Sequence, residues 1–354
     1  MKKEAIIDAV IPAYRPGAEF RELLKRLMAQ SRPLRRIIIM NTRTEVDMRT
    51  MAEDIPGAEI HELNKSEFDH GGTRDAGARL SDADYLLFLT QDALPADEYL
   101  VERLAAAFTE PQIKAAYARQ LARPDCRELE RYTRIFNSPE ETRVKTAADL
   151  DTLGIKTFFC SNVCAMYERE TYVNRGGFIR KTIFNEDMIY AGGLIKAGYA
   201  IAYAADARVI HSHNYSGLEQ FHRNFDLAVS QAEHPEIFGG VASEGEGIRL
   251  VKKTAAHCLR IRKPWLIVTL VWQSAWKFLG YRMGKSYRKL PHEPGLLERI
   301  PEITEDKFWQ SYMKIKRQPG SASSLSASAP GKMKMWRSPW TSLRNWPTPQ
   351  GRRP

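Results

Sequence analysis

The stretch Tyr85-Leu86-Leu87-Phe88-Leu89-Thr90-Gln91-Asp92-Ala93-Leu94-Pro95 decides the fold. It opens with five apolar residues preceded by polar ones, a pattern typical of a strand that is buried on both faces. Such a strand forms the centre of a layered α/β domain, and open α/β sheets bind ligands at the carboxyl edge of their strands. The sequence therefore places Asp92 at a candidate ligand-binding edge, although it could instead be a loop residue that caps a helix starting near Asp97.

Strands and helices alternate before this stretch. Apolar runs predict strands at 5–12, 35–40 and 58–63, and amphipathic spacing predicts helices at roughly 19–30 and 46–54. This alternation is typical of one half of a nucleotide-binding α/β fold. The patterns Gly-x-Gly-x-x-Gly and Gly-x-x-x-x-Gly-Lys are absent from the sequence, which argues against a dehydrogenase and against a P-loop NTPase.

The second half of the chain is less regular. We expect a helix over 98–108 and an edge strand over 113–119. The charge-rich segment 121–157 is interpreted as a long excursion, helical in parts, that covers the opening of the candidate ligand-binding site. Further strands are predicted at 158–167, 199–203 and 207–216.

A glycine pair occurs in residues 68–79, Phe-Asp-His-Gly-Gly-Thr-Arg-Asp-Ala-Gly-Ala-Arg. Paired glycines permit a tight loop or a close approach of the backbone to a ligand. A short helix is expected over 73–80, and a helix N-terminus beside an arginine, here Arg74, suits the base or phosphates of a nucleotide. The same pattern also occurs in ordinary turns.

Two groups of titratable residues follow. Glu186 and Asp187 begin a helical apolar pattern, so they either cap the helix or, facing a cleft, supply a general base. His211 and His213 end a predicted strand, and their spacing places both imidazoles on one side of an extended chain. That arrangement suits a divalent ion or an acidic phosphate, although most such pairs are not metal sites.

The net charge of +10 is a property of the C-terminal third. Residues 1–248 contain 31 Lys and Arg against 38 Asp and Glu, whereas 249–292 contain 11 basic residues and no acidic one. Residues 293–317 are balanced, and 318–354 carry six basic residues and no acid. The four cysteines have no zinc spacing, and without an N-terminal secretory signal we expect reduced, buried thiols in a cytoplasmic protein.

Seven short motifs occur in order along the chain: FDHGGTR (68–74), LTQDALP (89–95), FFCSNVCAMY (158–167), GGF (176–178), FNEDMIY (184–190), HSHNYS (211–216) and GYRMGKSYRKLP (280–291). Together they resemble the inverting glycosyltransferases of family 2, which have the GT-A fold. They are most similar to the bacterial rhamnosyltransferases that build cell-wall rhamnan and O-antigen-type polysaccharide. The resemblance implies an α/β, Rossmann-like mixed and mostly parallel sheet flanked by helices, with a C-terminal helical, membrane-proximal extension.

The resemblance also implies roles for individual residues. Asp187 matches the base that takes the proton of an acceptor hydroxyl, and Glu186 is its orienting neighbour or the base itself; one direct displacement inverts the anomeric centre. Asp92 and His211, with His213, match a site for Mg²⁺ or Mn²⁺ that neutralises a diphosphate. The residues expected to bind the nucleotide-sugar donor are Pro12, Tyr14, Arg15, Asn41, Arg74, Asp75, Gln91, Asp92, Ser161 and Asn162.

Three positions depart from the family pattern. The Asp-x-Asp motif is reduced to Gln91-Asp92-Ala93, so one acid remains for the metal. Asn41 replaces an aspartate that often reads a pyrimidine base, and Asp75 replaces an asparagine.

The segment 249–317 is basic and aromatic. Its apolar stretch from Pro264 to Leu279 is shorter than the roughly 20 residues that a bilayer crossing needs. Tryptophans beside lysines and arginines suit an anionic membrane surface, although an ordinary packing helix with a solvated basic face shows the same pattern. Nucleic acid is not an expected partner because residues 1–248 are acidic. Residues 318–354 lack periodicity and are expected to be disordered.

The sequence therefore predicts a catalytic domain over 1–248, a membrane-associating extension over 249–317 and an atypical tail over 318–354. The predicted activity is transfer of a sugar, L-rhamnose from dTDP-rhamnose, to a lipid-linked or growing cell-surface polysaccharide. The protein is expected to be cytoplasmic and peripheral on the inner face of the cell membrane. The alternatives are a family 2 transferase with a UDP-sugar donor and a non-catalytic membrane scaffold of a polysaccharide assembly complex.

Overall fold

In the computed structural model, the strand predicted around Phe88 is β4 (Tyr85–Leu89), and it lies in the middle of a mixed sheet. The structure describes residues 4–241 and 244–289, which belong to one compact unit. The predicted tail over 318–354 and the last part of the predicted extension, 290–317, lie outside the described residues.

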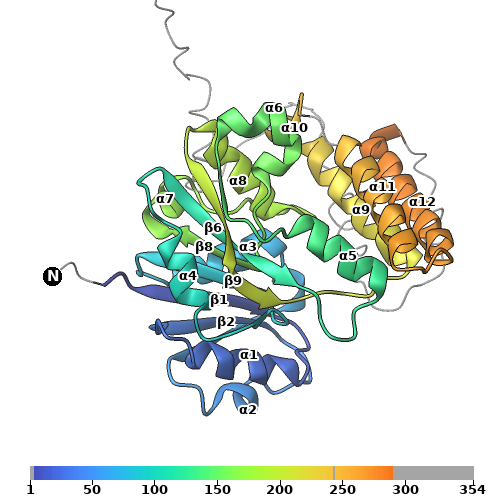
Figure 1. Cartoon of the computed structure of the whole chain (residues 1–354). Coiled ribbons are helices and arrows are strands. Elements are labelled where there is room, and N and C mark those ends of the chain that lie inside the picture. Colours follow the sequence, from blue (N-terminus) through green and yellow to red (C-terminus); the bar gives the residue numbers. More distant parts are fainter. Residues whose placement is uncertain (1–3, 242–243, 290–354) are drawn as a thin grey trace, which may run out of the picture. The chain divides into compact units, whose positions relative to one another are not determined.

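The sheet has nine strands in the order β3-β2-β1-β4-β8-β6-β9-β5, with β7 paired to β9 (Figure 1). Among the described residues, four pairings are parallel and four are antiparallel, so the antiparallel share is larger than the sequence predicted. The other strands are β1 (Ile7–Ala13), β2 (Arg36–Thr42), β3 (Ala58–Leu63), β5 (Leu94–Pro95), β6 (Ile113–Leu121), β7 (Arg143–Lys145), β8 (Cys164–Glu168) and β9 (Ala200–Ile210).

Helices cover both faces of the sheet and create two apolar cores. Ile11 of β1 points into one core, where Leu23 and Leu104 also lie, whereas the adjacent Val10 points into the other core with Phe88 and Phe178. Burial on both faces explains why β1, β2 and β4 are nearly continuous apolar runs. The first face carries α1 (Glu19–Met28), α2 (Arg49–Ala52) and α4 (Leu100–Ala106), and the second carries α3 (His70–Arg79), α7 (Arg169–Asn174) and α8 (Glu186–Lys196).

Two strand predictions were wrong in the second half of the sheet. β6 was predicted at an edge but lies between β8 and β9. Its residues from Ala115 to Ala118, three alanines and a tyrosine, are all buried, which is typical of a central strand. The strands predicted at 199–203 and 207–216 form one strand, β9, which ends at Ile210, so residues 211–216 are not in a strand. A shift in the pairing of β9 with β6 between Ala118 and Arg119 keeps the ladder continuous.

Two further boundaries differ from the prediction. The strand expected over 158–167 begins only at Cys164, because Gly154–Phe158 forms a 3₁₀-helix (η3) and a loop follows it. The helix expected over 73–80 begins earlier, at His70, because the Asp69 side chain accepts a hydrogen bond from the Gly72 backbone and caps it.

The directions of the strands bring the carboxyl ends of several strands to one edge of the sheet. β8 is antiparallel to both β4 and β6, so β6 runs in the direction of β4, and β9 is parallel to β6. The carboxyl ends of β1, β2, β4, β6 and β9 therefore share one edge with the loop that precedes β8. This is the edge at which open α/β sheets bind ligands.

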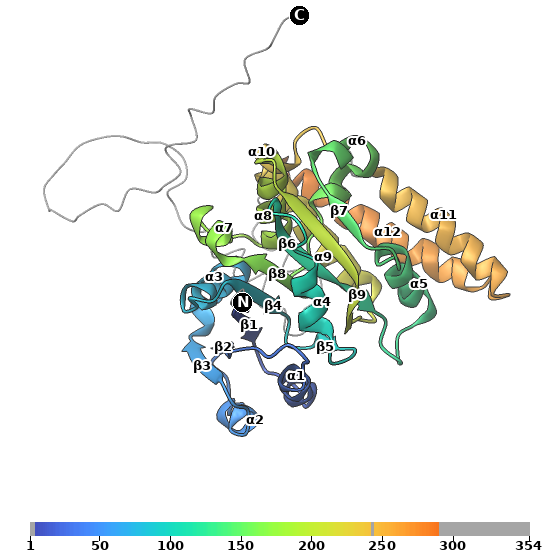
Figure 2. The ribbon, with the colours of Figure 1, turned by 60° about the vertical axis from the view of Figure 1, so that its left-hand side comes forward.

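The C-terminal part forms a helical layer beside the sheet, in yellow and orange in Figures 1 and 2. It consists of α9 (Gly217–Glu233), α11 (Glu244–Arg260) and α12 (Leu266–Lys285). α12 packs very closely on α9, since a Cβ atom at Gly280 or Gly284 would lie 2.2 or 2.3 Å from a backbone oxygen of α9. The boundary predicted between residues 248 and 249 falls inside α11.

The remaining helices lie partly in the excursion after β6 and partly elsewhere in the described chain. They are α5 (Glu128–Asn137), α6 (Leu150–Leu153) and α10 (Pro235–Phe238), with 3₁₀-helices η1 (Lys65–Glu67), η2 (Ala147–Asp149) and η4 (Tyr287–Lys289). Among the residues that the structure describes, none of the helices combines the length and the apolar character that a membrane crossing requires.

Candidate functional site

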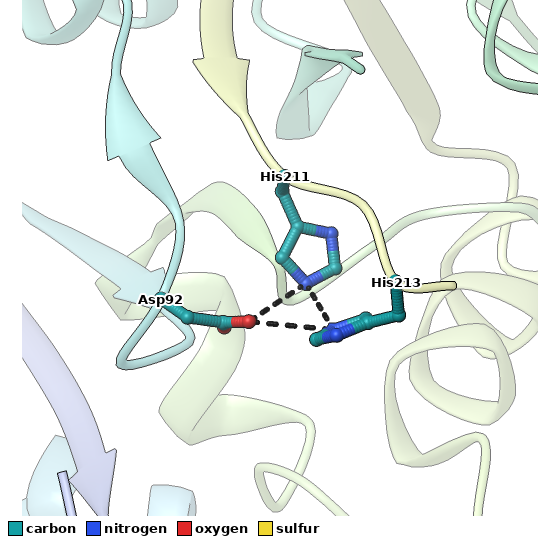
Figure 3. A group of neighbouring side chains, drawn as sticks. All are labelled: Asp92, His211 and His213. Carbon is teal, nitrogen blue, oxygen red and sulfur yellow. Dashed lines mark hydrogen bonds and ion pairs between the residues drawn. The ribbon is translucent and has the colours of Figure 1, made fainter. Parts of the chain in front are cut away.

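Asp92, His211 and His213 meet at the carboxyl edge of the sheet (Figure 3). Asp92 follows β4, and the two histidines follow β9. Asp92 Oδ2 lies 3.5 Å from His211 Nε2 and 3.3 Å from His213 Nε2, and the two Nε2 atoms are 3.1 Å apart. The sequence predicted these three residues as one group, and the fold brings their ligand atoms within 4.8 Å of one another.

The environment of this cluster suits a divalent metal ion. Burial lowers the pKa of His211 to about 3 and also lowers the pKa of His213, although Asp92 opposes both shifts. Both imidazoles are therefore neutral near pH 7, which is the form that binds metal. One carboxylate and two neutral imidazoles give a donor set that fits a divalent transition metal.

Glu186 lies at the start of α8 and is held in a buried ion pair. Its Oε1 atom is 3.1 Å from Arg74 Nη1 and accepts a hydrogen bond of 3.2 Å from Asn162 Nδ2. Burial alone would raise the pKa of Glu186, but Arg74, His70 and the bond from Asn162 favour the ionised form and lower it. Glu186 is therefore a fixed negative charge next to Asp187.

Asp187 has a different environment and remains partly open to solvent. Its carboxylate accepts backbone hydrogen bonds from Asn162 at 3.0 Å and from Met188 at 2.8 Å. Burial, followed by the charge of Glu186, raises the pKa of Asp187 to about 7. A half-buried carboxylate with a pKa near neutrality is suited to accept a proton from a bound hydroxyl group. The geometry thus gives the two adjacent acids opposite pKa shifts.

A glutamine that the sequence analysis did not select connects the two groups. Gln120, near the end of β6, contacts His211 Nδ1 at 3.3 Å and donates to Ser161 Oγ at 3.1 Å. Ser161 precedes Asn162, which bonds both acids. A polar residue next to the end of an alanine-rich strand was the available signal, and the prediction ended that strand at Arg119.

The loop after β1 is joined to the loop that carries Asp92. The Tyr14 backbone N–H donates to Gln91 Oε1 at 2.8 Å, and Gln91 Nε2 donates back to the Tyr14 carbonyl at 3.1 Å. Arg15 has a positive φ of 43° and pairs with Glu45 at 3.1 Å. The predicted donor-binding residues Pro12 and Asn41 also lie at this edge, at the ends of β1 and β2.

Two predicted donor-binding residues make contacts inside the protein. Arg74 is buried against Glu186. Asp75 is also buried and accepts bonds of 2.9 Å from both Arg79 and Arg180. The glycine pair likewise serves internal packing, because a Cβ atom at Gly71 would lie 2.0 Å from the Ile179 carbonyl oxygen. These contacts hold α3 against the loop that leads to α8.

Comparison with known proteins identifies the family. Residues 8–175 match the family described as Glycosyl transferase family 2. The chain is 38% identical over 289 residues to the O-antigen chain rhamnosyltransferase RfbN of Salmonella typhimurium, covering 80% of this chain and 91% of that protein. The chain belongs to glycosyltransferase family 2. This family 2 transferase is also 38% identical over 287 residues to the O-antigen chain rhamnosyltransferase WbaN of Salmonella anatum, covering 80% and 90% of the two chains.

A solved structure supports the fold of this transferase. The mannosyltransferase PcManGT from Pyrobaculum calidifontis, in complex with GDP-Man and Mn²⁺, matches it with a TM-score of 0.55 at 14% identity. The match covers 83% of this chain and 89% of that chain. The predicted family and GT-A type of α/β fold are confirmed.

The raised pKa of Asp187 predicts an acidic limb in the pH dependence of turnover. Asp187 accepts a proton only when ionised, so kcat should rise with pH through a midpoint near 7. Asp187→Asn should lower kcat by about 10²- to 10⁴-fold. The folded state favours protonated Asp187, and that stabilisation is lost as pH rises through about 7, so the neutral asparagine should not lower Tm at pH 8.

Glu186→Gln provides the second arm of the same measurement. Removing the neighbouring charge should lower the pKa of Asp187 and move the acidic limb to lower pH. A pH profile of kcat that is flat in the wild type, or that Glu186→Gln leaves unchanged, would contradict a role of Asp187 as the general base.

Proposed function

We propose that this protein is an inverting glycosyltransferase that transfers L-rhamnose from dTDP-rhamnose to a lipid-linked or growing O-antigen-type polysaccharide. The observation that supports this proposal most is the joining of two groups at one sheet edge. The Asp92, His211 and His213 cluster suits a diphosphate-bound metal, and Asp187 suits a base. A hydrogen-bonded path through Gln120 connects them.

Asp187 would take the proton of the acceptor hydroxyl. As that oxygen forms its bond to the anomeric carbon, the bond from this carbon to the diphosphate oxygen breaks on the opposite face, and the configuration inverts. The two backbone N–H groups that bind Asp187 orient its carboxylate. Glu186, kept ionised by Arg74, raises the basicity of Asp187, although Arg74 itself acts in the opposite direction.

The metal would act on the leaving group. A divalent ion bound by Asp92, His211 and His213 would supply positive charge to the departing diphosphate. Two imidazole nitrogens favour Mn²⁺ over Mg²⁺ as the ion, because Mg²⁺ prefers oxygen ligands.

The names of the relatives support the choice of sugar. Two proteins with 38% identity over nearly their whole length carry the name O-antigen chain rhamnosyltransferase. We infer the same sugar for this chain, delivered as dTDP-rhamnose, and a polysaccharide acceptor.

A donor screen tests this proposal. Purified protein with Mn²⁺ and an extracted lipid-linked glycan would be supplied with dTDP-rhamnose, UDP-glucose, UDP-galactose or UDP-N-acetylglucosamine, and nucleotide release would be measured. Release of dTDP should exceed that of UDP, should fall with EDTA, and should be lower with Mg²⁺. Asp92→Ala should lower it at least about 10²-fold, whereas the exposed Asp151→Ala is the matched control and should not.

The other outcomes of the screen are equally informative. Preference for a UDP-sugar would contradict the rhamnose assignment and keep the mechanism. Absence of turnover with every donor, together with normal polysaccharide assembly in cells that carry Asp187→Asn, would indicate a non-catalytic scaffold instead.

We also propose that α12 contacts an anionic membrane surface. One side of α12 packs on α9 through its glycines, and the other exposes large apolar residues. Residues 249–289 carry 11 basic residues and no acidic one, which complements anionic lipid. A site on the inner face of the cell membrane would bring the enzyme to a lipid-linked acceptor. The exposed apolar residues are Trp265, Val268, Val271, Trp272, Phe278 and Leu279.

Vesicle binding tests the membrane contact. Wild-type protein should sediment with vesicles of phosphatidylglycerol and phosphatidylcholine, less with pure phosphatidylcholine, and less at high salt. Val268→Asp should reduce sedimentation at least about 5-fold, because Val268 is 74% exposed on this side. Val173→Asp, a matched change at an exposed valine of α7, should not. Equal sedimentation of the two variants, or a dimer that hides α12 in solution, would contradict the proposal.

A further inference from the structure

Two residues that were not predicted for the site, Gln120 and Arg134, lie on the Nδ1 side of His211. Gln120 Oε1 accepts a hydrogen bond of 2.6 Å from Arg134 Nη1 and lies 3.3 Å from His211 Nδ1. Gln120 Nε2 donates to Ser161 Oγ at 3.1 Å. Because Gln120 is only 7% exposed, its amide must find these partners inside the protein.

Arg134 determines which way the Gln120 amide points. A guanidinium group only donates hydrogen bonds, so the amide atom that it contacts is the oxygen. His211 Nδ1 faces the same oxygen and must therefore carry a proton to bond with it. A neutral imidazole has one N–H group, so His211 Nε2 is unprotonated, and this nitrogen faces Asp92 and His213 (Figure 3).

On His213 the proton lies on the other ring nitrogen, Nε2. Its Nε2 atom lies 3.1 Å from the unprotonated His211 Nε2 and 3.3 Å from Asp92 Oδ2, and both of these atoms are acceptors. His213 Nε2 must therefore carry the proton in this arrangement. His211 is prepared to bind a metal through Nε2, whereas His213 must first move its proton to Nδ1.

One C-terminal helix, α11, supports the hydrogen bonds that run from Arg134 through Gln120 to His211. Arg134 is on α5 and is held there by Glu130, at 2.9 Å. The same helix is fixed to α11 by His257, whose ring stacks on Tyr132 at 4.3 Å and whose Nε2 lies 3.0 Å from Glu128. Helix α11 of the basic C-terminal segment is thus connected through α5 and Gln120 to the cluster of Asp92, His211 and His213.

We propose that Gln120 and Arg134 are positioning residues that hold His211 in its Nδ1–H tautomer and so prepare its Nε2 atom for the metal. The proposal rests on the proposed function only in taking the cluster as a metal site. Outer partners of this kind typically change metal affinity by about 10- to 100-fold when removed.

The test observes the tautomers directly. Protein labelled with ¹⁵N-histidine and treated with EDTA would be studied by long-range ¹H–¹⁵N correlation, and Mn²⁺ affinity would be measured by calorimetry. The wild type should show His211 protonated at Nδ1 and His213 at Nε2. Gln120→Leu should remove the preference at His211 and weaken Mn²⁺ binding about 10- to 100-fold. Gln112→Leu, at an exposed glutamine, is the matched control and should change neither.

Two further variants sharpen the result. Gln120→Glu keeps an oxygen facing Arg134 and His211 but cannot donate to Ser161, so tautomer and Mn²⁺ affinity should stay within about 3-fold of the wild type. Arg134→Met frees the amide to turn and should shift the His211 tautomer, which keeps the test valid even where Gln120→Leu fails to fold. Arg127→Met, at the exposed start of α5, is its control.

The proposal is overturned where wild-type His211 is protonated at Nε2, or where Gln120→Leu leaves tautomer and affinity unchanged. The wild type could fail to bind any divalent ion while its His211 tautomer still depends on Gln120. That result would support the positioning of His211 by Gln120 and overturn the metal assignment of the proposed function.

Discussion

The buried ion pair between Arg74 and Glu186 is the interaction on which the site depends. It fixes the start of α8 against α3 and keeps Glu186 ionised in a buried position. Burial and that fixed charge raise the pKa of Asp187, so the two adjacent acids titrate differently. Removing one partner of such a pair typically costs about 3–5 kcal/mol, because the other charge stays buried and unpaired.

The antiparallel strand β8 connects the two acids to the cluster of Asp92, His211 and His213. Because β8 runs against β4 and β6, the loop before it lies at the carboxyl edge of those strands. Ser161 and Asn162 in this loop therefore reach Gln120 on one side and the two acids on the other. With β8 parallel to its neighbours, the same loop would lie at the opposite end of the sheet.

Features that depend on local sequence were predicted well. The apolar runs of β1, β2 and β4 and the group of Asp92 with two histidines follow from patterns within a few residues and from the family resemblance. Features that depend on distant partners were not predicted. The central position of β6 is set by pairing with β8 and β9, which lie more than 40 residues later. The sequence shows that Arg74 is charged but not that Glu186 neutralises it.

The same reason explains why Gln120 was not predicted. Its importance comes from three contacts, with Arg134, Ser161 and His211, which are separated from it by 14, 41 and 91 positions in the chain. The pattern around it is an ordinary strand end. The role of a buried amide is visible only when its donors and acceptors are located in space.

The central claim is that the cluster of Asp92, His211 and His213 forms one site with Glu186 and Asp187. Crystals grown with dTDP and Mn²⁺ and measured at the manganese absorption edge would test it most directly. We expect one anomalous peak bound by Asp92, His211 and His213, with the diphosphate between this ion and Asp187. Bound nucleotide with its diphosphate on another edge of the sheet, or manganese bound by other residues, would contradict it.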